Sequence, residues 1–237
     1  MIRVTIYNEF VHEQTEERVR KVYPKGIHEA LKSFLESDDI TVRCFTLDTV
    51  NEITDEVLEN TDVMLWWGHM RHKDVPDEVA CRVRDAVHKG MGMVFLHSGH
   101  HSKPFRLLMG TQCNLTWREN GDMERVWTVK PAHPIAQGIG RYFELPHEET
   151  YGEPFTIPNP DDVIFIGWYE GGEVFRSGVT FQRENGRIFY FQPGHETNPT
   201  YYDPNVQKVI RNAVYWAKPI YRVNELSAPH VKKPGEE

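Results

Sequence analysis

The sequence predicts an α/β fold whose sheet is mainly parallel, with antiparallel additions in the second half of the chain. Three observations lead to this prediction. Four strand patterns alternate with helix patterns before residue 97, which is typical of parallel sheets with right-handed crossovers. The strand patterns are short and largely apolar, as in strands covered on both faces. In the second half, strand patterns follow one another without regular helices between them.

The elements of the first half follow from periodicity and from residues typical of helix ends. Strands are expected at residues 2–7, 40–47, 62–67 and 91–96. Helices are expected at 27–37, at 54–60 with Thr54 as N-cap, and from 74–78 to Lys89-Gly90 with Pro76 near its start. Ligands of open α/β sheets bind beyond the carboxyl ends of the strands, so the loops after these strands are the place to search for a site.

The second half is less regular. Strands are expected at residues 123–129, 162–169, 174–182 and 187–192, the last two joined by a hairpin turn at Asn185-Gly186. Apolar spacing predicts a helix over 206–216 that covers the sheet. We expect one domain over residues 1–217, followed by a tail, 218–237, that is peripheral or bound to a partner. Such a tail could reach a neighbouring protomer, so a homo-oligomer is compatible with the sequence.

Composition excludes several classes of protein. The chain of 237 residues carries 27 Lys and Arg against 35 Asp and Glu, which disfavours nucleic acid as a partner. The longest apolar stretch, 63–67, is too short for a membrane span, and the first residues lead straight into a strand without a secretion signal. Three separated cysteines predict neither disulfides nor a thiolate metal site, so a cytoplasmic location is expected. The composition is unusual in one respect, because 12 of the residues are histidines.

His97 is the most prominent candidate for a functional residue. It follows the apolar run 91–96 directly, in a polar turn that contains Gly99 and precedes a helical segment. This arrangement resembles a nucleophile elbow, in which the residue after the strand is held above the sheet edge. Because the residue is His rather than Ser or Cys, covalent acyl transfer is disfavoured and a role as proton carrier or metal ligand is favoured. A histidine that only hydrogen-bonds within its turn is the alternative.

Histidines also follow two further predicted strands. His69 and His72 follow the third strand, and His195 follows the last strand in the run Gly194-His195-Glu196. Side chains dispersed over several strand ends can together build a metal or acid–base site. The position directly after a buried strand favours His69 over His72, which could be solvated.

Other histidines stand beside carboxylates. The pairs His12-Glu13 and His147-Glu148-Glu149 could supply a metal ligand, a general base or a residue that orients a ligand. The first pair follows the first strand at the expected sheet end, whereas the second lies in a region whose placement cannot be derived. We interpret His133 as supporting a turn, and His28, His88 and His230 as surface or packing residues.

The chain also resembles a known family. The segments 92–98, 147–151 and 194–195, and the run HPIAQGI at 133–139, are similar to those of the trehalose-utilisation (ThuA-like) family, over about residues 1–217. The resemblance implies the flavodoxin-like, doubly wound sheet of the class I glutamine amidotransferases. Amidotransferases of that superfamily have Cys at the elbow and His-x-Glu after a late strand, where this chain has His97 and His195-Glu196. Glutamine amidotransfer is therefore not expected.

The resemblance implies a role in the use of trehalose or related disaccharides, and keto-type glycosides as substrates. The expected reaction is isomerisation or epimerisation by proton abstraction beside a carbonyl, polarised by a divalent metal, zinc above all. We assign the metal to His69, His97 and His195, with His97 and His195 also catalytic and Glu148 or Glu13 as a mobile base. No nucleotide cofactor is expected. The same residues suit a hydrolase with metal-bound water, and the rival hypothesis is a non-catalytic sugar-binding or regulatory protein.

Aromatic side chains supply candidates for the wall of a sugar-binding cleft, because aromatic faces with polar neighbours suit sugar rings. Trp117, Tyr151 and Tyr201 are the aromatic residues we expect there, and His101 is the histidine that we expect to bind the substrate. Packing in the core is the alternative for each of the aromatic residues.

Overall fold

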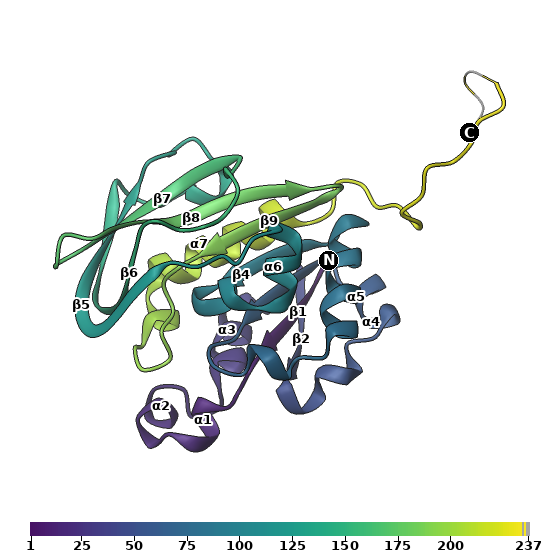
Figure 1. Ribbon diagram of the computed structural model, residues 1–237. Helices are drawn as coiled ribbons and strands as arrows, with labels where there is room; N and C mark the ends of the chain where they lie inside the picture. Colours follow the sequence, from purple (N-terminus) through teal and green to yellow (C-terminus); the bar gives the residue numbers. More distant parts are fainter. Residues whose placement is uncertain (234, 236–237) are drawn as a thin grey trace.

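Nine strands form one sheet in the order β2-β1-β3-β4-β9-β8-β7-β5-β6 in the computed structural model, which describes residues 1–233 and 235. The parallel half consists of β2 (Ile40–Thr46), β1 (Ile2–Asn8), β3 (Val63–Trp67), β4 (Gly92–Leu96) and β9 (Gly186–Phe191). The antiparallel half continues from β9 through β8 (Val174–Arg183), β7 (Asp162–Tyr169), β5 (Thr116–Thr128) and β6 (Tyr142–Gly152). This confirms the predicted fold class (Figure 1).

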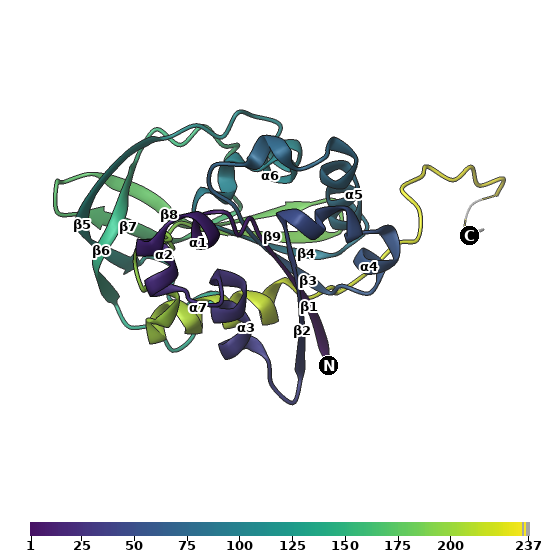
Figure 2. The ribbon, with the colours of Figure 1, turned by 90° about the horizontal axis from the view of Figure 1, so that it is seen from below.

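Helices cover both faces of the parallel half (Figure 2). One face carries α3 (Ile27–Leu35) and α7 (Pro204–Ala217), and the other carries α4 (Asp55–Glu59), α5 (Asp77–His88) and α6 (Lys103–Met109). Two short helices, α1 (His12–Thr15) and α2 (Glu17–Val22), follow β1. The short 3₁₀ helices are η1 (Leu47–Glu52), η2 (His72–Asp74), η3 (His97–His101), η4 (Pro134–Ala136) and η5 (Thr200–Tyr202).

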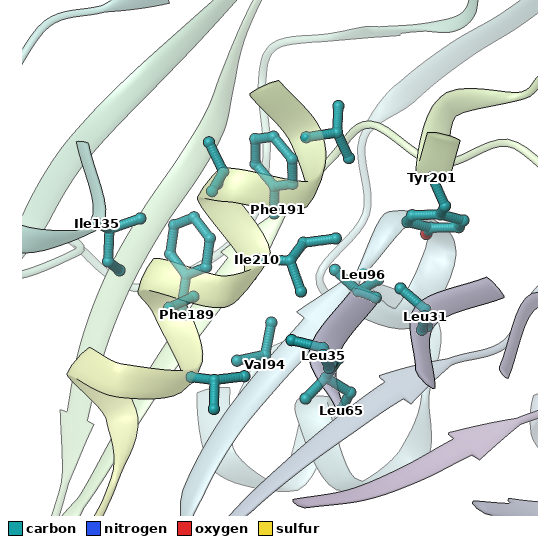
Figure 3. Close-up of a cluster of buried hydrophobic side chains, with 14 of the residues drawn as sticks. Leu31, Leu35, Leu65, Val94, Leu96, Ile135, Phe189, Phe191, Tyr201 and Ile210 are labelled. Carbon is teal, nitrogen blue, oxygen red and sulfur yellow. The ribbon is translucent and has the colours of Figure 1, made fainter. Parts of the chain in front are cut away.

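Strand alternation explains why the sheet needs both helical layers. In β3, Val63, Leu65 and Trp67 join the core beneath α3 and α7, while Met64 and Trp66 join the core beneath α5 and α6. All five side chains are almost completely buried. Full burial of one large apolar side chain contributes roughly 1.5–3 kcal/mol, so neither face could remain uncovered. Figure 3 shows the first of these cores, with residues of β4 and β9 against α7.

Helix α7 shows how local sequence sets an element's start. The Asp203 side chain accepts hydrogen bonds from the backbone N–H groups of Asn205 and Val206, at 2.8 and 3.1 Å. Pro204 follows at the first helical position, where its missing N–H costs nothing. The helix predicted over 206–216 is therefore present and begins two residues earlier, at Pro204.

The structure differs from the expected elements in the antiparallel half. Strand β6 was not predicted, and β5 begins at Thr116 rather than at residue 123. The two-residue loop of the last hairpin is Glu184-Asn185, because Gly186 already pairs with Arg183. A side chain at position 186 would collide with the backbone oxygen of Val87, which explains the glycine there.

The beginning of the predicted tail packs on the amino end of the parallel strands. The Arg222 guanidinium donates to the backbone oxygens of Glu59 and Thr61, and the Val223 N–H donates to the oxygen of Lys89. Residues 234, 236 and 237 of that tail lie outside the described residues. No helix in the described part of the chain is long and apolar enough to cross a bilayer.

Candidate active site

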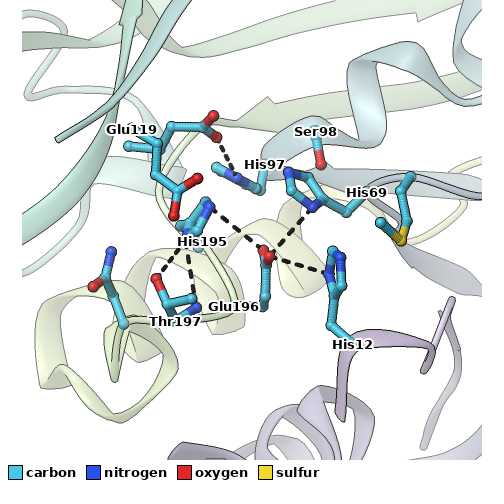
Figure 4. Close-up of polar contacts among 12 residues, drawn as sticks. His12, His69, His97, Ser98, Glu119, His195, Glu196 and Thr197 are labelled. Atoms are coloured by element: carbon cyan, nitrogen blue, oxygen red, sulfur yellow. Dashed lines mark hydrogen bonds and ion pairs between the residues drawn. The ribbon is translucent and has the colours of Figure 1, made fainter. Parts of the chain in front are cut away.

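Four histidines converge beyond the carboxyl ends of the parallel strands (Figure 4). His12 follows β1, His69 follows β3, His97 follows β4 and His195 follows β9. The ring centroids of His69, His97 and His195 lie 5.4–5.9 Å apart, and that of His12 lies 5.0 Å from that of His69. The parallel topology therefore brings together residues that are up to 183 positions apart in the sequence.

His97 occupies a strained turn between β4 and η3. Its φ angle is 52°, in the left-handed region that residues with a side chain rarely adopt. Its ring is fully buried and stacks on Tyr151, with ring centroids 5.2 Å apart. Nδ1 lies 2.9 Å from the backbone oxygen of Gln192, which can only accept, so Nδ1 carries the proton. Nε2 is thereby left free to bind a cation or a proton.

Glu149 supplies the carboxylate beside His97, and it comes from the other half of the sheet. Its Oε2 lies 3.0 Å from His97 Nε2. The Gln192 side chain donates to the backbone oxygen of Glu149 at 3.1 Å, which ties β6 to the segment after β9. Sequence reasoning noted Glu149 within His147-Glu148-Glu149 but did not select it, because β6 itself was not predicted.

The Glu196 carboxylate lies among the other imidazoles. Its Oε1 is 3.1 Å from His12 Nδ1 and 3.3 Å from His69 Nδ1, and its Oε2 is 3.7 Å from His195 Nε2. In the sequence, Glu196 was identified only as the neighbour of His195. His12 was identified only as a member of one of two histidine–carboxylate groups.

The facing atoms are close but poorly aligned for hydrogen bonds. Nδ1 of His12 and His69 and Nε2 of His97 and His195 are buried, and none has a hydrogen-bond partner among the described residues. The same holds for the carboxylate oxygens Glu149 Oε2 and Glu196 Oε2. Buried polar atoms without partners cost about 1–3 kcal/mol each, so such a concentration of them points to a ligand.

Two groups of these residues have the donor set of a divalent cation. His69, His97, Glu149 and His195 each offer one atom within 4.8 Å of the others, and His12, His69 and Glu196 meet the same limit. Imidazole nitrogens with one carboxylate oxygen are the ligands that Zn²⁺ prefers, and other first-row divalent ions accept them too. The residues present therefore fit a cation.

The pKa values in the cluster reflect burial and mutual contact. Burial by itself lowers the pKa of His97, but the Glu149 carboxylate outweighs it and raises that pKa to about 9. Burial acts to raise the pKa of Glu149, and the facing His97 holds it below its ordinary value. Burial lowers the pKa of His195 to about 4, so this ring is neutral at pH 7. Burial acts to raise the pKa of Glu196, and two neighbouring imidazoles hold it far below the usual range.

Glu148 and Glu13, predicted as mobile bases, each accept several hydrogen bonds in this structure. The Glu148 carboxylate accepts hydrogen bonds from the N–H groups of Glu149, Gly194 and His195 and from the Thr200 hydroxyl, at 2.8–3.1 Å. Oε1 of Glu13 accepts from the Asn8 side chain at 2.7 Å and from the N–H of Ile27, the first residue of α3, at 3.0 Å. Both carboxylates are buried and hold the backbone that carries the site.

A third carboxylate that fixes the backbone, the buried Glu9, was not identified from the sequence. It accepts the backbone N–H groups of His69, Met70 and Arg71 at 2.9–3.1 Å and so fixes the loop that carries His69. Its place directly after β1, at the same sheet edge as the histidines, is the signal that could have identified it.

The four residues expected to contact substrate lie in different environments. Tyr151 stacks on His97 and is 2% exposed. His101 is partly exposed in η3, with its ring centroid 6.3 Å from that of His72. Trp117 pairs with Tyr151 across β5 and β6 and is 65% exposed. Tyr201 is fully buried in the core beneath α7, packed against Gly194.

Three other histidines have structural surroundings. His133 Nδ1 accepts the N–H of Ile135 and caps the turn η4, the supporting role inferred from the sequence. His28 packs against Phe10 and hydrogen-bonds to the Asn8 side chain. His72 is partly buried rather than fully solvated.

Comparison with known proteins gives a family match and a set of similar folds. The model of a family described as "Trehalose utilisation" (ThuA) matches residues 3–217. No curated protein matches the sequence. A ThuA-like protein from Parabacteroides merdae is similar in structure, with a TM-score of 0.68 and 17% identity, over 94% of this chain and 92% of that one.

Two further solved structures extend the likeness of fold. A cytoplasmic protein from Salmonella typhimurium has a TM-score of 0.61 and 12% identity, over 92% of this chain and 100% of that one. A protein from Thermoplasma acidophilum, described as part of a GMP synthase, has a TM-score of 0.54 and 12% identity, over 91% and 93%. At these identities the comparisons support the flavodoxin-like, amidotransferase-like fold.

Proposed function

The chain belongs to the trehalose-utilisation (ThuA) family, and we propose that it is an enzyme of disaccharide use that moves a proton beside the carbonyl of a keto-glycoside. One observation carries the proposal. Three imidazoles and a carboxylate, from the ends of β3, β4 and β9 and from β6, present buried atoms without hydrogen-bond partners among the described residues, all within 4.8 Å of one another. Such a set suits both cation binding and proton transfer.

His69, His97 and His195 are the residues that we propose as ligands of a divalent cation, zinc above all. A bound divalent cation would supply Lewis-acid polarisation of the carbonyl oxygen. The fixed proton on His97 Nδ1 leaves Nε2 as its ligand atom, and the Glu148 carboxylate fixes the backbone of His195. The substrate is a small carbohydrate, and the proposed location is the cytoplasm.

Glu149 takes the role of base, in place of the immobilised Glu148 and Glu13. The proton leaves the carbon beside the carbonyl for a Glu149 carboxylate oxygen, and the electron pair of the C–H bond moves toward the carbonyl oxygen. A proton delivered by water to the opposite face of that carbon epimerises the sugar. Return of the Glu149 proton to the carbonyl carbon isomerises it, when the proton of the adjacent hydroxyl moves to the former carbonyl oxygen. Positioned bases of this kind contribute about 10²–10⁴-fold to rates.

The test combines metal content with isotope exchange. We expect purified protein to contain zinc or to bind it, and to incorporate solvent deuterium into a keto derivative of trehalose. Glu149→Gln should lower the exchange rate by about 10²–10⁴-fold. Glu144→Gln is the matched control, because Glu144 is an exposed residue of the same strand, and its exchange rate should equal that of the unaltered protein.

Other outcomes separate the alternatives. Release of free sugars without deuterium exchange would establish a hydrolase that uses the same residues. Binding of the sugar with neither exchange nor hydrolysis would establish a non-catalytic sugar-binding or regulatory protein. Full metal retention in both His97→Ala and His195→Ala would show that the ligand set is wrong. Amidotransfer is not proposed, because the residue after β4 is an imidazole rather than a thiol.

A further inference from the structure

We propose that the cleft between α5 and α6 is a second binding site, which takes a small molecule with an apolar body and one oxyanion head, a carboxylate or a phosphate. The two helices cover the same face of the parallel half of the sheet (Figure 2). No residue of the histidine cluster lines this cleft, so the inference is independent of the proposed function.

The cleft has the size and the lining of a site for a small molecule. Its volume is about 510 Å³, and most of its accessible lining is apolar. Sites for small molecules are typically clefts of about 300–1,000 Å³ with apolar walls and a few polar groups. Ala80 and Cys81 of α5 and Leu107 of α6 contribute to the wall. Leu107 is 42% exposed, so contact with an apolar ligand would remove its side chain from water.

The charged side chains that line the cleft do not balance one another. They are Asp77, Lys103 and Arg106. The Lys103 ammonium group donates to the Asp77 carboxylate at 2.5 Å and to the backbone oxygen of Val75 at 2.6 Å. The carboxylate of the cleft is therefore already paired with Lys103, and the positive charge of Arg106 is left without a counter-charge.

Arg106 is the residue that indicates an anionic ligand. Its Nε is buried and has no hydrogen-bond partner among the described residues. A buried donor without a partner costs about 1–3 kcal/mol, and a charged group costs more. The N–H groups of a guanidinium form a planar fork that matches two oxygens of a carboxylate or a phosphate. A ligand with such a head would satisfy both the charge and the unpaired donor.

The other arginines of these two helices differ from Arg106, because each has a carboxylate partner. Arg82 Nε lies 3.4 Å from a carboxylate oxygen of Asp55. Arg84 Nη2 lies 2.8 Å from a carboxylate oxygen of Asp85. The unpaired guanidinium is thus a feature of the cleft rather than of this helical layer.

The chemistry of the lining also separates this ligand from other classes. Two positive side chains disfavour a metal cation, and a neutral sugar would leave the charge of Arg106 uncompensated. An inorganic anion would leave the apolar wall in contact with water. Only a molecule with both an apolar body and an anionic head matches the whole lining.

The test compares complete ligands with their separate halves. The unaltered protein is titrated by calorimetry with octanoate and octyl phosphate, and with octanol and inorganic phosphate as the separate halves. We expect octanoate or octyl phosphate to bind at least about tenfold more tightly than either half, and the tighter of the two identifies the head as carboxylate or phosphate. Equal affinities for octanol and the two complete ligands would overturn the anionic class.

A variant tests the role of the guanidinium. Arg106→Gln should weaken the binding of the complete ligand by about 10–100-fold, because a hydrogen bond to a charged group is lost. The matched control is Arg84→Gln, because Arg84 is paired with Asp85 and does not line the cleft. Its affinity should equal that of the unaltered protein. Circular dichroism checks that both variants are folded, and unchanged affinity in folded Arg106→Gln would overturn the assignment.

Alkylation of Cys81 locates the bound ligand. Cys81 is partly exposed and lines the cleft, whereas Cys44 packs against the core on the opposite face of the sheet. Octanoate should slow the reaction of Cys81 with iodoacetamide, followed by mass spectrometry of peptides, and leave that of Cys44 unchanged. Binding without protection of Cys81 would place the ligand elsewhere and overturn the site. Protection that grows with protein concentration and needs no octanoate would assign the cleft to contact between copies of the chain, which would also overturn it.

Discussion

The two halves of the sheet contribute to the site in different ways. The parallel half supplies all four imidazoles, and each follows the carboxyl end of its strand: His12 after β1, His69 after β3, His97 after β4 and His195 after β9. The antiparallel half supplies Glu149, which faces the cluster from within a strand, and Glu148, which fixes the backbone before His195. The strand topology places the four imidazoles, whereas contacts between the two halves of the sheet place Glu148 and Glu149.

The halves also differ in what holds them together. Successive side chains of a parallel strand point in turn into the two apolar cores. Strands β3 and β4 show this, because their successive apolar residues belong to different cores. The antiparallel half carries buried polar groups where it meets the site. There the Ser177 hydroxyl contacts both Glu124 and Gln192, and burial raises the pKa of Glu124 well above its ordinary value. A buried polar network forms only when all its partners are in place.

The largest effect on stability is expected in the contact between the halves. Glu148→Ala leaves four hydrogen-bond donors without their acceptor and should lower the free energy of unfolding by about 3 kcal/mol. Urea denaturation measures the free energy of unfolding of this variant. Glu144→Ala, on the exposed side of the same strand, should cost under about 1 kcal/mol. Equal effects of the two substitutions would contradict a structural role for Glu148.

A smaller effect is expected from the backbone of the parallel half. His97 has a positive φ angle, so His97→Gly should be more stable than His97→Ala by about 1 kcal/mol. Both variants lack the imidazole, and the difference therefore isolates the backbone. At His147, in a strand of ordinary backbone conformation, the same pair of substitutions should favour alanine. If alanine is also favoured at position 97, the inference that this turn has a strained backbone is wrong.

The smallest effect concerns the opposite, amino end of the parallel strands. Burial acts to raise the pKa of Asp62, but hydrogen bonds from Arg3 outweigh it and hold that pKa below its ordinary value. A depressed carboxyl pKa stabilises the fold above the unfolded value of about 3.9, and this stability is lost as pH falls through the folded pKa.

The partial exposure of this ion pair keeps its contribution under about 1 kcal/mol. The free energy of unfolding should fall between pH 7 and pH 3 in both proteins. The fall should be smaller in Asp62→Asn than in the unaltered protein, by under about 1 kcal/mol. An unchanged pH dependence would show that the pair contributes nothing to acid stability.

The sequence by itself determined the parallel half and its imidazoles. Short apolar runs and helix ends predicted the strands before His69 and His97, and those strands have a common carboxyl edge because they are parallel. The glycine-flanked His195 could be recognised in the same way, since it too follows a strand. Each inference needed only residues that are close together in the sequence.

Only the tertiary structure decided which carboxylates belong to the site. Neighbouring residues of a strand point to opposite sides, so Glu148 and Glu149 take different roles although they are adjacent. Strand β6 buries charged side chains whose partners lie after β4 and after β9, so no apolar pattern marked it in the sequence. Contacts with neighbouring side chains also separated Tyr201, which packs in the core beneath α7, from Tyr151, which stacks on His97. Interactions between distant segments fixed these assignments, and a local pattern cannot contain them.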